Sequence, residues 1–127
     1  MKFTEQVFCT LQVEGTHNWP GCPFDEVSYL RDEHRHVFHI KAYKKVTHSD
    51  RDVEFIMLKH QLEHYVNWKY KNIDKVLADG SAIRGTNLCK FGAKSCEMIA
   101  KELIEQFDLV ACEVSEDNEN GAIVEVA

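Results

Sequence analysis

The stretch Arg31-Asp32-Glu33-His34-Arg35-His36-Val37-Phe38-His39-Ile40 decides the fold. It opens a segment rich in Val, Phe, Ile and Tyr, which predicts a strand from about residue 34 to residue 47. On a strand His34 and His36 leave the same face, with Cα atoms roughly 7 Å apart. Phe38 and Ile40 continue that face with apolar side chains. The histidine pair is therefore expected where a buried surface meets an opening.

The rest of the chain predicts three more strands and two helices. We expect strands over about 3–13, 109–114 and 122–126, and helices over about 55–67 and 95–107. Residues 24–32 favour a short helical turn, and residues 14–23 and 68–92 favour loops. Ser49 and Asp52 are spaced as a capping box for the first helix, and Ser95 suits the N-cap of the second.

The expected element order is ββααββ. Two hairpins with two helices between them predict an α+β fold, in which a four-stranded antiparallel sheet carries both helices on one face. The first and last strands of such a sheet are open edges, which favours self-association.

Composition excludes several classes of function. The chain of 127 residues, 44% apolar and 28% charged, is typical of one soluble domain spanning 1–127. Its net charge of −6 includes no basic stripe, which argues against a nucleic-acid partner. It has no run of about 18 apolar residues, so we expect no membrane span. The five cysteines are odd in number and irregular in spacing, which favours reduced thiols in a cytoplasmic protein.

A third histidine, His17, is expected near the histidine pair, because it follows the first strand where the second strand begins. Three neutral imidazoles and a water make a catalytic type of zinc site with one open position. The residues alone leave an alternative open, in which His34 and His36 form hydrogen bonds at a strand end.

Glu116 is a candidate ligand-binding residue. A carboxylate at a strand end can accept two hydrogen bonds from the amino-pyrimidine edge of a pterin or a purine. The alternative is a solvated turn, because Asp117 and Glu119 are also acidic. Glu113 is less suitable, since it lies three residues away and faces the opposite side of the strand.

Three further residues are candidates for chemistry. His48 and Arg51 follow the second strand in a polar cluster, and they suit an acid–base pair or a phosphate clamp. Cys22 is a candidate nucleophile if a cation lies beside it. A purely structural thiol is the alternative for Cys22.

The order of these motifs resembles the 6-pyruvoyltetrahydropterin synthase family, which includes 6-carboxytetrahydropterin synthase and has the tunnelling fold. His17 and the His34-Arg35-His36 pair take the places of the family's metal-binding histidines. Ser95-Cys96-Glu97-Met98-Ile99-Ala100 resembles the motif that opens its second helix, and Glu116 takes the place of its pterin-binding glutamate. The resemblance implies a zinc cofactor, a heterocyclic small-molecule ligand, and subunits that assemble into a ring, such as a hexamer, with sites between subunits.

Two positions depart from the family pattern. The family's catalytic cysteine precedes the histidine pair by a few residues, where this chain has Tyr29-Leu30-Arg31-Asp32. The family's aspartate–histidine pair after the first helix is also missing. The resemblance therefore implies either a zinc-dependent lyase of the 6-carboxytetrahydropterin synthase type or a non-catalytic protein that holds or sequesters a nucleotide-derived ligand.

Overall fold

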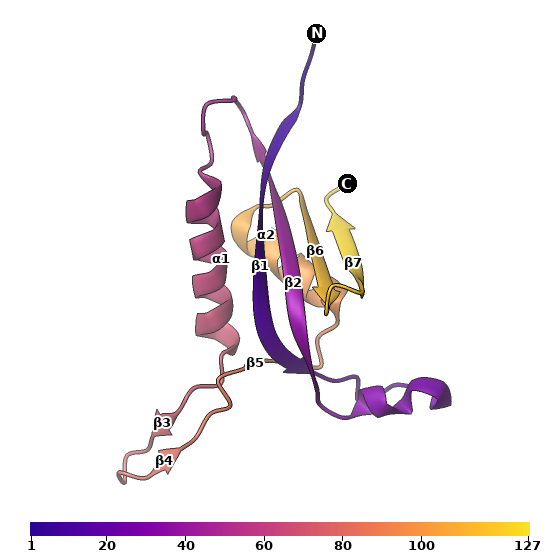
Figure 1. Ribbon diagram of the computed structural model, residues 1–127, viewed down its shortest axis with the longest axis vertical. Helices are drawn as coiled ribbons and strands as arrows, with labels where there is room; N and C mark the ends of the chain where they lie inside the picture. The colour runs from indigo at the N-terminus through magenta and orange to yellow at the C-terminus, as the bar shows by residue number, and fades with distance from the viewer.

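A computed structural model describes residues 1–127, and a five-stranded sheet of order β5-β1-β2-β6-β7 organises it. The four antiparallel strands that the sequence predicts are present and adjacent (Figure 1). They are β1 (Glu5–His17), β2 (His34–Val46), β6 (Ala111–Glu116) and β7 (Asn120–Glu125). The expected α+β arrangement is therefore confirmed.

Part of the region expected to be a loop contains additional strands. β5 (Cys89–Gly92) pairs in parallel with the end of β1 and becomes the fifth strand of the sheet. β3 (Lys75–Val76) and β4 (Ala82–Ile83) form a separate hairpin, which projects away from the sheet in Figure 1. These strands are too short for a periodic pattern in the sequence to identify them.

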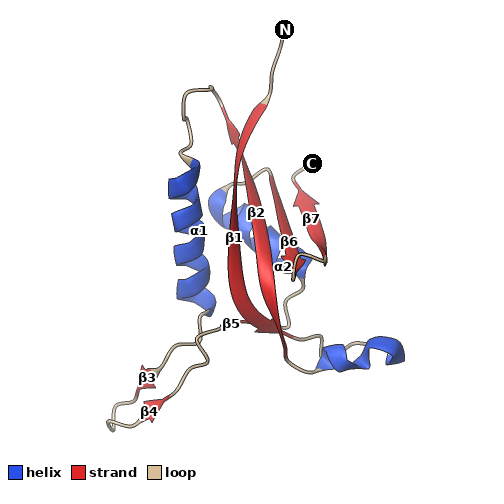
Figure 2. Ribbon diagram, in the orientation of Figure 1, coloured by secondary structure: helices blue, strands red, loops and turns tan.

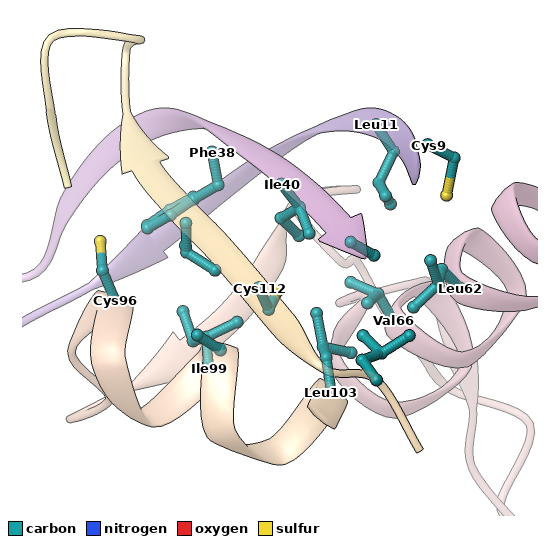
Figure 3. Close-up of a cluster of buried hydrophobic side chains, with 14 of the residues drawn as sticks. Cys9, Leu11, Phe38, Ile40, Leu62, Val66, Cys96, Ile99, Leu103 and Cys112 are labelled. Atoms are coloured by element: carbon teal, nitrogen blue, oxygen red, sulfur yellow. The ribbon is translucent and has the colours of Figure 1, made fainter. Parts of the chain in front are cut away.

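Both helices pack on one face of the sheet, as expected. α1 (Phe55–Tyr70) buries Leu58, Leu62 and Val66, and α2 (Cys96–Phe107) buries Ile99 and Leu103. These side chains join one core with the apolar face of β2, where Phe38, Ile40 and Ala42 are fully buried (Figure 3). None of the helices combines the length and the apolar composition needed to cross a membrane.

Of the two N-caps that the sequence predicts, the one at α2 is correct and the one at α1 is not. Ser95 caps α2 as expected, because its Oγ accepts the Met98 N–H at 3.2 Å. The capping box predicted for α1 is wrong, because the N-cap is Glu54, whose carboxylate accepts the first free N–H groups of the helix. Asp52 instead accepts the N–H and the hydroxyl of Thr47.

The connection between β1 and β2 lies at one end of the sheet. It contains the short 3-10 helix η1 (Asp25–Arg31), which lies beyond the end of the sheet in Figure 2 and matches the expected helical turn. β1 extends further than expected, through His17, so that His17 and His34 are direct partners across the strand pair.

Candidate metal centre

Strand register brings the three predicted histidines together. His17 ends β1 opposite His34, and His36 lies two residues along β2 on the same face. The ring centroids of His17 and His34 are 4.7 Å apart, those of His34 and His36 are 4.9 Å apart, and those of His17 and His36 are 5.4 Å apart. The antiparallel pairing of β1 with β2 therefore accounts for the cluster without any contribution from a loop.

Each imidazole is oriented by a hydrogen bond at Nδ1. The acceptors are the Lys94 carbonyl for His17 at 2.9 Å, the Asp32 carbonyl for His34 at 2.8 Å and the Asp117 carboxylate for His36 at 2.7 Å. A carbonyl or an ionised carboxylate can only accept, so Nδ1 carries the proton in all three rings. In the neutral rings Nε2 then presents a lone pair.

These three Nε2 atoms are buried and none of them makes a hydrogen bond, although the Glu116 carboxylate lies close to two of them. Together with one oxygen of Glu116 they form a set of ligand atoms that lie within 4.8 Å of one another. Buried polar atoms without partners are rare in proteins and are costly. Histidines that donate from Nδ1 to a carbonyl or carboxylate and converge through Nε2 are typical of metal sites, and nitrogen with oxygen is a donor set that suits zinc.

Glu116, at the end of β6, faces the histidines. One carboxylate oxygen lies 2.8 Å from Nε2 of His36, and the other lies 3.6 Å from Nε2 of His17. A lone pair on Nε2 and a carboxylate oxygen repel at such a distance unless a proton or a metal ion lies with them. The four side chains therefore form a group that could hold a metal ion.

The electrostatics agree with a carboxylate that is ionised. The adjacent imidazole of His17, together with those of His36 and His34, lowers the pKa of Glu116 although burial opposes this. Burial lowers the pKa of His17, but Glu116 and the Lys94 carbonyl outweigh it, and the pKa is raised overall. The hydrogen bond from His36 lowers the pKa of Asp117.

A pocket of about 550 Å³ opens beside the cluster. This volume is in the range of small-molecule sites. The pocket is bounded by the end of β1, the start of α2 and the β6–β7 turn. Its lining residues are His17, Asn18, Trp19, Leu30, His34, Ala93, Lys94, Ser95, Cys96, Glu97, Met98, Glu116, Asn120 and Gly121.

Sequence reasoning did not single out several residues of this site. Asp117 orients His36, the Lys94 carbonyl orients His17, and Trp19 forms part of the pocket wall. Cys96 lines the pocket with its Sγ 3.8 Å from Glu116, and burial together with this carboxylate raises the pKa of the thiol to about 12. The position of Cys96 directly after the N-cap Ser95 was the only available signal, and it does not distinguish a pocket residue from a core residue.

The other three candidate residues, Cys22, His48 and Arg51, do not line the pocket beside the histidines. Cys22 is buried, and its Sγ lies within 3.8 Å of the carbonyl oxygens of Phe24 and Val27 without lining the pocket. His48 and Arg51 follow the far end of β2, a strand of 13 residues that is about 40 Å long. Figure 1 shows their loop at the end of the sheet opposite the β1–β2 connection. The roles expected of all three remain predictions.

Comparison with known proteins supports the fold. The sequence matches no protein-family model and no curated protein. Among solved structures, 6-pyruvoyl tetrahydropterin synthase of Plasmodium falciparum is similar, with a TM-score of 0.57 and 18% identity over 97% of this chain and 98% of that chain. The resemblance that the motif order indicates is therefore confirmed at the level of the fold, which is of the tunnelling type.

Proposed function

We propose that this protein is a zinc-dependent enzyme that acts on a pterin-like or purine-like small molecule, in the manner of 6-carboxytetrahydropterin synthase. One observation carries the proposal: three buried Nε2 atoms converge beside the Glu116 carboxylate without making a hydrogen bond, and an acceptor fixes the opposite nitrogen of each ring. The pocket beside them and the similarity to a pterin synthase in fold support the choice of ligand.

The residues have distinct roles in this proposal. His17, His34 and His36 hold the metal, which when bound polarises a substrate oxygen and lowers the pKa of a bound water. Glu116 is ionised and lines the pocket, so it can accept hydrogen bonds from the ring N–H groups of the ligand. Glu116 must turn from His36 toward the pocket to do so.

A second candidate function is a protein that holds a nucleotide-derived ligand without converting it. It is favoured by the 2.8 Å contact between Glu116 and His36, because a carboxylate that stays with the histidines completes a set of four ligands. A zinc ion with four protein ligands is of the structural type and has no open position. His48 and Arg51 follow the end of β2 opposite to His34 and His36, so within one chain neither supplies an acid or base to the cluster.

Metal analysis tests the proposal. We expect one zinc per chain in the purified protein and, in the His36→Ala variant, a loss of zinc affinity of at least about 100-fold, because a ligand is removed. His39→Ala is the matched control, since His39 lies on the same strand but faces the opposite side of the sheet. A wild-type protein that takes up no zinc on reconstitution would refute the proposal.

A single variant separates the two roles open to Glu116, and a turnover assay separates the two candidate functions. If Glu116 binds the ligand, Glu116→Gln keeps its zinc and loses affinity for pterin. If Glu116 is the fourth zinc ligand, the same variant loses zinc affinity, because an amide oxygen is a weaker ligand than a carboxylate. Incubation of the zinc-loaded wild type with dihydroneopterin triphosphate then shows either conversion or binding of an unchanged ligand.

A further inference from the structure

One wall of the pocket is an aromatic ring that is only partly covered. Trp19 is two residues beyond His17 and lines the same pocket. The residue is 44% exposed. A tryptophan that fills the core would be nearly buried, so the open part of this ring is available to a ligand.

Local contacts hold the main chain that carries this ring. The backbone N–H of Trp19 donates to the Leu30 carbonyl at 2.6 Å, and the backbone carbonyl of Trp19 accepts the Cys22 N–H at 3.1 Å. The indole also meets the ring of Phe24 edge-on, with centroids 5.9 Å apart and an interplanar angle of 64°. A tryptophan side chain has only two rotatable bonds, so it loses little conformational entropy when a ligand stacks on it.

The remaining lining combines apolar surface with polar groups. Met98, in the first turn of α2, is 53% exposed in the same pocket and supplies a second, adaptable apolar surface. Glu97, Glu116 and Asn120 supply hydrogen-bond acceptors. Apolar surface with acceptors around it fits a flat ring that carries N–H groups at its edge.

We propose that Trp19 is the stacking surface for a planar heteroaromatic ring whose substituent reaches the histidine cluster. The inference rests on the proposed function, because it places the ligand between Trp19 and the metal centre. It adds a ring-binding residue that contributes to ligand choice and not to metal binding.

The test is equilibrium dialysis of zinc-loaded protein against pterin. Trp19→Ala is expected to weaken pterin binding about 10-fold, the size of a lost aromatic stacking contact. Trp19→Phe is expected to restore most of the affinity, because it keeps an aromatic face. The matched control is Trp68→Ala, which removes a tryptophan that is 74% exposed on α1 and does not line the pocket.

A probe without a ring separates stacking from damage to the metal site. Acetohydroxamate binds zinc directly, so its affinity and the zinc content are expected to be unchanged in Trp19→Ala. The inference is overturned if Trp19→Ala binds pterin as tightly as the wild type, if Trp19→Phe is as weak as Trp19→Ala, or if zinc-loaded wild type binds no pterin. Zinc content measured on the same samples reports separately on the proposed function.

Discussion

At the residue scale, Asp117 is the side chain that orients His36. It accepts from Nδ1 of His36 at 2.7 Å and from the Val37 N–H at 2.9 Å, so it joins the β6–β7 turn to the start of β2. Its backbone is left-handed, with a φ of 55°, a conformation that aspartate and asparagine tolerate better than most residues. The carboxylate therefore fixes the tautomer of His36 and raises the basicity of its Nε2.

We predict that Asp117→Asn lowers zinc affinity by about 10–100-fold, the usual effect of losing such a partner of a ligating histidine. Asparagine keeps the size of the side chain and tolerates the left-handed backbone, so the fold is expected to persist. Competition with a chromophoric chelator measures the affinity. Glu119→Gln, in the same turn, is the control and is expected to bind zinc like the wild type; equal affinity in Asp117→Asn would contradict the prediction.

At the scale of the elements, Glu102 joins the two helices. This residue of α2 accepts from Tyr65 at 2.9 Å and from Lys69 at 3.0 Å, both on α1, and also from Tyr70. Lys94, in the segment before α2, lies 3.3 Å away. Burial raises the pKa of Glu102, but the hydrogen bonds, led by the one from Tyr70, outweigh it and lower the pKa to about 2.

A depressed pKa of this kind predicts a stability that depends on pH. The unfolded carboxyl has a pKa near 4.5, so the contribution is fully present above this pH and is lost as the pH falls toward about 2. We expect Glu102→Gln to lower the free energy of unfolding by about 1–3 kcal/mol at pH 7 and by clearly less at pH 3.5. Urea unfolding at both pH values measures this; Glu105→Gln, on the exposed face of the same helix, is the control. A loss independent of pH would show that the charge of Glu102 is not the cause.

Long elements were predictable from the sequence, and contacts between elements were not. β2 and α2 were identified because Phe38, Ile40 and Ile99, Leu103 repeat at strand and helix spacing. β5 was not predicted, because its four residues are too few for a periodic pattern and become a strand through pairing with β1. The triad was identified because two of its histidines belong to one strand, whereas Asp117 and the Lys94 carbonyl reach the site through folding of distant segments.

At the scale of the whole molecule, the sheet has an open edge at β7. β7 is paired on one side only, and the helices cover one face of the sheet. On the other face lies a shallow depression whose lining includes Thr10, Gln12, His39, Lys41 and Ile123. Ile123 is 60% exposed on β7. An exposed apolar side chain on an edge strand favours pairing with another chain, whereas soluble monomers usually protect such an edge with charge.

We therefore predict that the chain self-associates through this edge, and that Ile123→Lys shifts the assembly to monomers by introducing a charge that must be desolvated on pairing. Sedimentation equilibrium measures the mass of the assembly. Glu105→Lys introduces the same charge on the exposed face of α2 and is expected to leave the mass unchanged. If Ile123→Lys keeps the wild-type mass, the edge of β7 is not the interface, and a wild-type monomer would mean that the pocket of one chain must bind its ligand without a neighbouring subunit.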